Sequence, residues 1–279
     1  MKINEILWTK TNTYPEKDEV LKLIKSHYSD AAKNFLDGNK LYRGIDLSVK
    51  FLEVDNSSIE RKSTTMNSNN YNRLLSDILP SWKKYPKRNK SVICGTSMGI
   101  AKGYGSHIYI VLPKNTASIG FCPTADIWDS FKYAYEMLEK DEIVFKALYK
   151  SKLIDKMRSN YLDNYPNIDT ITRNNIPDVL KFYSGDQLYS FDGKVQQILN
   201  RCNLTLEEFL DLKVDNIDLK TYFDEYFDPE KNKFYLSKNL NDIDSKNYDR
   251  NEVWTDSKCL LIKWEYASDL ISEALAKQD

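Results

Sequence analysis

Residues 91–122 constrain the fold of this chain more than any other stretch. The segment His107–Leu112 reads His-Ile-Tyr-Ile-Val-Leu, and this concentration of β-branched and aromatic residues is typical of a strand. Apolar strands are also predicted at Ser91–Cys94 and Ala117–Cys122, and Thr96–Gly105 predicts a short turn or helix between the first two strands. The order strand, helix, strand is βαβ-like, so the chain is expected to contain a sheet.

Helical and irregular patterns precede this stretch. Apolar residues recur at helical spacing over residues 15–37, where Pro15 suits the first turn and Gly38 suits a C-terminal stop. A short strand is expected at Lys40–Ile45, and a brief helix at Tyr71–Leu79. The residues between these two elements are rich in hydroxyl and turn-forming side chains, so they predict irregular structure.

The second half of the chain changes from helical to strand-like patterns. Residues 125–230 show mostly helical spacing, and the run Thr205-Leu206-Glu207-Glu208 has the order of a capping box. Strand character then returns, before a final helix at about 267–276. We therefore expect an α+β fold in which residues 1–124 and 231–279 form one domain. Residues 125–230 would be a helical insertion, of a length within ordinary domain sizes.

The charge balance argues against a general nucleic-acid binder. The 279 residues include 40 Lys or Arg and 41 Asp or Glu, which gives a net charge of −1 and no basic field. The local basic run Lys83–Lys90 is interpreted as a solvated linker ahead of a strand, with a phosphate-binding patch as the alternative. No stretch approaches the ~20 apolar residues that cross a bilayer, and the N-terminus lacks a signal-peptide pattern. We therefore expect a cytoplasmic protein without a membrane span.

Neither a metal site nor disulfide bonds are indicated. No Cys-x-x-Cys pair is present, and His27 and His107 are far apart, so the close ligand spacing of a zinc site is missing. Three cysteines lie in or beside apolar runs, as buried thiols do. These are Cys94, Cys122 and Cys259, and the fourth cysteine is Cys202. We therefore expect no metal site, and free thiols in a reducing compartment.

Three distant segments each place a polar residue at the end of an apolar, strand-like run. In the first, Leu41–Gly44, Arg43 follows two apolar residues and precedes a glycine. A guanidinium there can bind a pyrophosphate or a ribose through paired donors, and Gly44 can let a ligand approach the backbone. The alternative is a surface arginine at a strand end.

The second segment combines hydroxyls with a tyrosine. Thr96 and Ser97 stand where a strand turns into a short helix, so their hydroxyls can cap the helix or bind a sugar hydroxyl. Tyr104 lies between Gly103 and Gly105, which suggests a ring presented at a tight turn and able to stack on a planar base. The alternative is a core tyrosine beside a hairpin.

The third segment is Asn251–Trp254, just ahead of another apolar strand. If the carboxylate of Glu252 points into a cleft, it can hydrogen-bond a ribose hydroxyl and stabilise positive charge developing on the sugar ring. The alternative is a solvent-facing glutamate on an edge strand.

Together, these segments resemble the R-S-E class of mono-ADP-ribosyltransferases. That family orders its site along the chain as an arginine, a Ser-Thr-Ser strand end followed by an aromatic–glycine pair and a strand, and a Glu-x-Glu strand start. Arg43, Gly95-Thr96-Ser97 with Tyr104 downstream, and Glu252 match these elements. The resemblance implies a split β-sandwich core with an N-terminal helix, in which a cleft between two small sheets binds NAD.

The resemblance also implies the chemistry. Glu252 would be catalytic together with Arg43 and Ser97, and would stabilise an oxocarbenium-like transition state while a target nucleophile attacks the anomeric carbon. Arg43 would hold the phosphates or ribose of NAD, and Tyr104 would pack on the nicotinamide. NAD would be consumed as a substrate, and no metal would be required. The NAD-binding residues would be Arg43, Gly44, Ser91, Thr96, Ser97 and Tyr104.

The chain departs from the family pattern at two positions. Gly95 stands where the first serine is expected, so a neighbouring hydroxyl would have to substitute for it. The candidates are Ser91, Thr96 and Ser97. Arg250 stands where the upstream glutamate is expected, which disfavours an arginine as the acceptor. Glu136 and Glu139 offer another glutamate pair, but they lie in a helical run rather than at a strand start.

The sequence therefore predicts NAD-dependent ADP-ribosyl transfer to a host macromolecule, with a protein as the expected target. The family occurs among bacterial toxins and among phage enzymes that modify host proteins, and a phage-encoded member would act in the host-cell cytoplasm. The alternative is a non-catalytic protein of the same fold that inhibits a host defence protein through its helical insertion. A nucleic-acid-binding protein that uses Lys83–Lys90 is the least favoured hypothesis.

Overall fold

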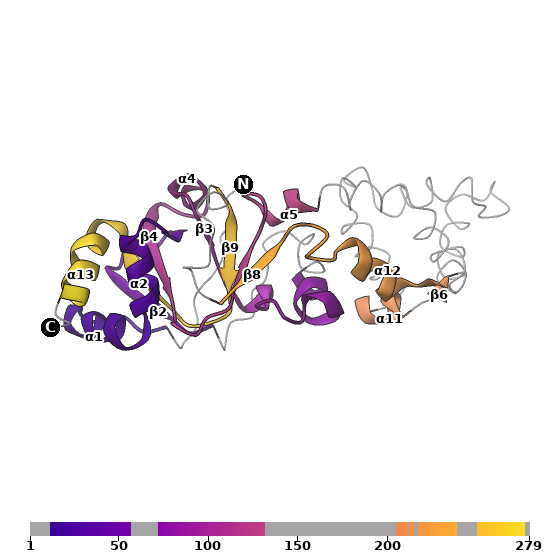
Figure 1. Ribbon diagram of the computed structural model, residues 1–279, viewed down its shortest axis with the longest axis horizontal. Helices are drawn as coiled ribbons and strands as arrows, with labels where there is room; N and C mark the ends of the chain where they lie inside the picture. The colour runs from indigo at the N-terminus through magenta and orange to yellow at the C-terminus, as the bar shows by residue number, and fades with distance from the viewer. Residues whose placement is uncertain are drawn as a thin grey trace, which may run out of the picture.

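The structure is a computed structural model that describes residues 12–56, 72–131, 205–211, 213–214, 217–238 and 250–276. It combines a large antiparallel sheet with helices, so the expected α+β class is confirmed (Figure 1). Within the described part of the chain, no helix is both long enough and apolar enough to span a bilayer. Most of the expected helical insertion lies outside the described residues, as do Glu136, Glu139 and Cys202.

Eight strands form one sheet in the order β2-β10-β4-β1-β3-β9-β5-β8, and each neighbouring pair is antiparallel. In chain order they are β1 (Tyr42–Ile45), β2 (Phe51–Val54), β3 (Val92–Gly95), β4 (His107–Pro113), β5 (Ile119–Phe121), β8 (Tyr235–Ser237), β9 (Glu252–Thr255) and β10 (Cys259–Lys263). Within these strands, β1 and β3 are in register at one position, Tyr42 opposite Gly95. The sheet is therefore joined by this short pairing, and the four strands on either side of it are called its half-sheets below.

The predicted strand–helix–strand order at the centre of the chain is confirmed, but the two strands are not neighbours in the sheet, because β1 lies between them. β3 is followed by the short helix α4 (Met98–Lys102) and then by β4. β1 pairs antiparallel with both strands, so β3 and β4 run parallel to each other with β1 between them. Strand β4 is buried from Tyr109 to Pro113, since β1 and β10 pair with its edges and α2 (Ser29–Leu36), α4 and α13 (Trp264–Ala276) contact it as well.

The single helix expected over residues 15–37 is wrong, because the structure has two helices there. They are α1 (Lys17–His27) and α2 (Ser29–Leu36). The break is stabilised by Asn115, from the turn after β4. Its backbone N–H donates to the carbonyl of His27 (2.9 Å), and its Oδ1 accepts from the N–H of Asp30 (3.1 Å). One residue distant in sequence thus satisfies the end of α1 with its backbone and the start of α2 with its side chain.

Helices α1 and α2 pack with α13 (Trp264–Ala276) at one end of the molecule (Figure 1). Val20 and Ile24 of α1 and Ile271 of α13 are fully buried in the main hydrophobic core. Burying each such side chain stabilises the fold by roughly 1.5–3 kcal/mol. This end of the molecule therefore gives the half-sheet that carries β1 a rigid support.

Strand β2 corrects the expectation of irregular structure between residues 46 and 70. Its four residues pair with β10 at the edge of the sheet, and Glu53 bridges to Thr13 on the outer side. The brief helix expected at Tyr71–Leu79 is confirmed, and over Leu74–Ile78 it is a π-helix.

An aromatic cluster joins the other half-sheet to the elements at the far end of Figure 1, which include α11 (Leu206–Leu210) and α12 (Leu219–Tyr226). Trp82 lies 6.3 Å from Trp254 of β9, measured between ring centroids, and its Nε1 donates to the carbonyl of Phe227 (2.8 Å).

The capping box predicted at the start of α11 is confirmed. Thr205 Oγ1 accepts from the N–H of Glu208 (3.2 Å), whose Oε2 accepts from the N–H of Thr205 (2.7 Å).

Candidate active site

The candidate site lies where the two half-sheets meet. Gly95, at the end of β3, is opposite Tyr42 of β1 on one side and opposite Glu252 of β9 on the other. Arg43 is the next residue of β1. Three strand ends that are distant in sequence therefore bring the predicted arginine, hydroxyl segment and carboxylate side by side.

Hydrogen bonds fix the backbone at the start of β9. The N–H of Thr96 donates to the carbonyl of Asn251 (3.0 Å), and the N–H of Asn251 donates to Thr96 Oγ1 (2.8 Å). The N–H of Glu252 donates to the carbonyl of Thr124 (2.8 Å). Arg250, just before these residues, is exposed and has a left-handed φ of 63°. The carboxylate of Glu252 thus projects from a backbone that is held from both sides.

Arg43 is buried at the junction, with 2% of its surface exposed. Its Nη1 donates to the carbonyl of Ile93 on β3 (2.8 Å), so the side chain crosses from one half-sheet to the other. Its guanidinium lies 4.4 Å from the centroid of the Tyr104 ring, a cation–π contact. Burial lowers the pKa of Arg43 from its ordinary value, while Tyr104, Cys94 and Glu252 act in the opposite direction.

Two glycines of the site are required by packing within the chain. A Cβ on Gly44 would lie 2.1 Å from the carbonyl oxygen of Ala101 and 2.7 Å from the amide of Gly105. A Cβ on Gly95 would lie 2.6 Å from the Ile100 side chain. The close backbone approach expected at Gly44 is thus made by the chain's own backbone, and Ile100 takes the space of a side chain at residue 95.

The three candidate hydroxyls all bond to the backbone. Thr96 Oγ1 accepts from Asn251, as described above. Ser97 Oγ accepts from the N–H of Ile100 (3.4 Å) and caps α4, which is the capping alternative considered for this residue. Ser91 is fully buried, and its hydroxyl donates to the carbonyl of Lys87 (2.8 Å). Thr96 and Ser97 act as acceptors in these bonds, so each can still donate its hydroxyl proton to a ligand, whereas Ser91 donates its proton to Lys87.

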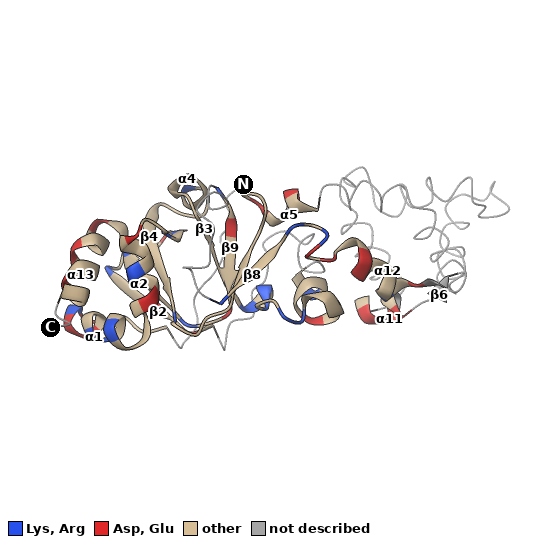
Figure 2. Ribbon diagram, viewed as in Figure 1, with Lys and Arg blue, Asp and Glu red and all other residues tan. Residues whose placement is uncertain are grey.

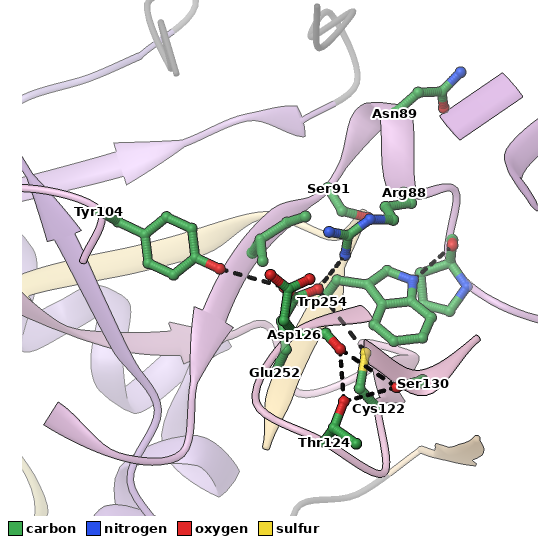
Figure 3. Close-up of polar contacts among 12 residues, drawn as sticks. Arg88, Asn89, Ser91, Tyr104, Cys122, Thr124, Asp126, Ser130, Glu252 and Trp254 are labelled. Carbon is green, nitrogen blue, oxygen red and sulfur yellow. Dashed lines mark hydrogen bonds and ion pairs between the residues drawn. The ribbon is translucent and has the colours of Figure 1, made fainter. Parts of the chain in front are cut away.

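Glu252 is 2% exposed, and both of its carboxylate oxygens have protein partners (Figure 3). Oε1 accepts from Nη1 of Arg88 and lies 3.9 Å from the thiol of Cys122. Oε2 accepts from the hydroxyl of Tyr104 (3.3 Å). Tyr104 contacts both Arg43 and Glu252, so it links the two predicted charged residues. In this structure its ring stacks on a guanidinium, in the place of the nicotinamide expected from the sequence.

Burial and the Glu252 carboxylate raise the pKa values of two neighbouring side chains, the Cys122 thiol and the Tyr104 hydroxyl. Desolvation, and then the negative charge of Glu252, raise the pKa of the Cys122 thiol well above its ordinary value. The same two causes, in the same order, raise the pKa of Tyr104. Both groups are therefore neutral at physiological pH, and each can act as a hydrogen-bond donor.

Arg88 is the site residue that sequence reasoning missed. It begins the short 3₁₀ helix Arg88–Lys90 and is 7% exposed, so this part of the run Lys83–Lys90 is no solvated linker. Burial, the largest single effect, would lower the pKa of Arg88, but Glu252, Cys122 and Tyr104 together outweigh it and raise that pKa. The one sequence signal was an arginine within a run of lysines, since a guanidinium suits buried ion pairs better than an ammonium.

The lysines of the same run behave as predicted for surface residues. Lys83, Lys84 and Lys87 are exposed. Lys84 pairs with Glu230, and Lys87 pairs with Asp77 (2.9 Å). Basic and acidic residues are mixed over the described elements (Figure 2). This arrangement lends no support to a phosphate-binding patch.

Alternate residues of β9 and its continuation hold the segment that carries Arg88. Trp254 Nε1 donates to the carbonyl of Pro86 (2.9 Å), and Asp256 Oδ2 accepts from the N–H of Lys87 (2.9 Å). Glu252 holds Arg88 in the same way. Because side chains two residues apart point to the same face of a strand, β9 binds this segment along its length.

Among the described residues, no group of three His, Cys, Asp or Glu side chains is placed to hold a metal ion. Comparisons of the chain with protein-family models, with curated proteins and with solved structures find no match.

Proposed function

We propose that this protein cleaves the nicotinamide–ribose bond of NAD and transfers ADP-ribose to an acceptor on a protein. The observation that supports the proposal is the row Tyr42, Gly95 and Glu252 across β1, β3 and β9, with Arg43 beside it. This row brings a guanidinium and a carboxylate from opposite half-sheets to one junction, as the resemblance to mono-ADP-ribosyltransferases requires. Tyr104 contacts both groups.

The chemistry follows from the charges. Arg43 would bind a phosphate or ribose oxygen of NAD through its fixed paired donors. As the glycosidic bond breaks, nicotinamide leaves with the bonding electrons, and positive charge develops on the ribose. A buried carboxylate stabilises such charge strongly, because little water screens it. The acceptor nucleophile then bonds to the anomeric carbon and loses its proton to solvent.

Ligand entry would begin at Tyr104. This side chain is partly exposed, whereas Arg43 and Glu252 are buried, so it covers both of them on the solvent side. Its hydrogen bond to Glu252, at 3.3 Å, is long compared with about 2.5–3.0 Å for a typical O–H···O bond. Rotation of Tyr104 would expose the carboxylate and leave the ring able to pack on the nicotinamide.

The experiment measures nicotinamide release from NAD by the purified protein and labelling of a host lysate with tagged NAD. We expect Glu252→Gln and Arg43→Lys to abolish both signals. Glu230→Gln, at an exposed ion pair, is the matched control and should retain them. Mass spectrometry of the labelled protein identifies the acceptor side chain. Nicotinamide release that persists in a folded Glu252→Gln variant would refute the proposal.

One observation favours a second candidate, a non-catalytic binding protein of the same fold. The Glu252 carboxylate is sealed by Arg88 and Tyr104, and the candidate hydroxyls bond to the chain's own backbone. A binding protein would show neither nicotinamide release nor a rise in melting temperature with NAD. An NAD-dependent rise in melting temperature, lost in Arg43→Lys, would instead support the transferase.

A further inference from the structure

The buried ion pair between Arg88 and Glu252 has a geometry that assigns different roles to the two carboxylate oxygens. We propose that Arg88 is a positioning residue: it anchors Oε1 of Glu252 so that Oε2 is presented to the ribose of NAD. This inference rests on the proposed function. It adds a residue to the site that lies outside the arginine, hydroxyl and glutamate segments of the family pattern.

The two oxygens differ in their surroundings. Oε1 faces the interior, where Arg88 donates to it and the Cys122 thiol lies 3.9 Å away. The side chains of Arg88 and Glu252 are 9% and 2% exposed. Oε2 faces Tyr104, which is partly exposed and makes a long hydrogen bond of 3.3 Å. A ligand that arrives from solvent therefore meets Oε2 first and has a weak contact to replace there.

Arg88 is itself held in place, as an anchor must be. On its N-terminal side, the segment is bound to β9 and the residue that follows it. The carbonyl of Pro86 accepts a hydrogen bond from Trp254, and the N–H of Lys87 donates one to Asp256. On the C-terminal side, the Ser91 hydroxyl donates to the carbonyl of Lys87 (2.8 Å) and closes the turn. The backbone that carries Arg88 is thus held on both sides, and the ion pair with Glu252 holds its guanidinium.

The consequence for catalysis is orientation. A carboxylate held at one oxygen cannot rotate away when Tyr104 moves, so Oε2 keeps its direction through ligand binding. Loss of the anchor would leave NAD binding to Arg43 intact but would misplace the group that stabilises the transition state. Misplacement of about 1 Å can cost on the order of 100-fold in rate.

The test compares steady-state NAD cleavage by the wild type with Arg88→Gln and Arg88→Lys. We expect Arg88→Gln to lower kcat about 100-fold with an unchanged KM, the signature of an interaction made in the transition state. Arg88→Lys restores the positive charge without the rigid fork of donors, so it should recover part of kcat. Arg73→Gln, at an exposed pair with Glu207, is the matched control and should behave as the wild type.

The outcomes separate this inference from the proposed function. An active wild type with an unchanged kcat in Arg88→Gln overturns the positioning role and leaves the transferase intact. A higher kcat in that variant also overturns it, because Arg88 would then block the site. A wild type that never cleaves NAD overturns the proposed function, and the positioning role with it. If Arg88→Gln does not fold, the test rests on kcat of Arg88→Lys. A kcat equal to that of the wild type would overturn the positioning role.

Discussion

The Arg88–Glu252 pair should be strongly coupled in the free energy of unfolding. Its side chains are 9% and 2% exposed, and removing one partner of a buried pair costs about 3–5 kcal/mol. We expect Arg88→Met to lie near the lower end of this range. Tyr104 still donates to Glu252 in that variant, and Arg43 still supplies a positive charge nearby. Glu252→Gln should cost a similar amount, because it leaves a buried guanidinium facing a neutral amide.

A double-mutant cycle measures the coupling by equilibrium urea unfolding, followed by tryptophan fluorescence. The double variant should be more stable than the sum of the two single losses predicts, by about 2 kcal/mol. Lys84 and Glu230 form the control pair, with side chains 53% and 70% exposed, and pairs of this kind contribute about 0–1 kcal/mol. A coupling for Arg88 and Glu252 no larger than that of the control would show that the buried pair is absent in solution.

Three further predictions concern packing and titration. Gly44→Ala should prevent folding or lower the melting temperature sharply, because its Cβ would lie 2.1 Å from a backbone oxygen, whereas Gly99→Ala, with 3.8 Å to its nearest neighbour, should be tolerated. Burial raises the pKa of Tyr85 to about 12, above the value of about 10 in an unfolded chain. Its contribution to stability should therefore be complete below about pH 10 and lost as the pH rises towards 12. Tyr85→Phe should weaken this alkaline loss, as measured by the free energy of urea unfolding at a series of pH values. Burial and Glu252 raise the pKa of Cys122, so the native protein should resist alkylation there at neutral pH, and mass spectrometry should find the adduct after unfolding. Rapid alkylation of native Cys122 would contradict its buried position.

The local sequence correctly predicted elements that form through their own residue pattern. The strand at His107–Leu112 is β4, and the capping box at Thr205 has the expected hydrogen bonds. Long-range contacts decided the elements that were missed. Asn115 divides the expected N-terminal helix in two, and β2 is a strand because β10 supplies its pairing partner. Neither partner can be identified from the local sequence.

The same distinction applies to the candidate site. Arg43 and Glu252 could be selected from the sequence because each ends an apolar run, and strand ends place such residues at the edge of a core. Arg88 had only the weak signal of an arginine among lysines, because the partner that pairs with it, Glu252, is 164 residues away. The use of Ser97 as a helix cap was foreseen as an alternative, since an N-cap hydroxyl is recognisable from the turn that it begins.

The placement of charge at the junction is itself an argument for function. Two arginines and a glutamate are buried where the half-sheets meet, although well-packed apolar side chains of similar volume would often give equal or greater stability. Gly95 and Gly44 show that packing there is already close. The buried guanidinium and carboxylate groups therefore carry a cost that the fold does not require. Tyr104 is partly exposed and contacts both Arg43 and Glu252, so under the proposed function a ligand would reach these groups past its ring.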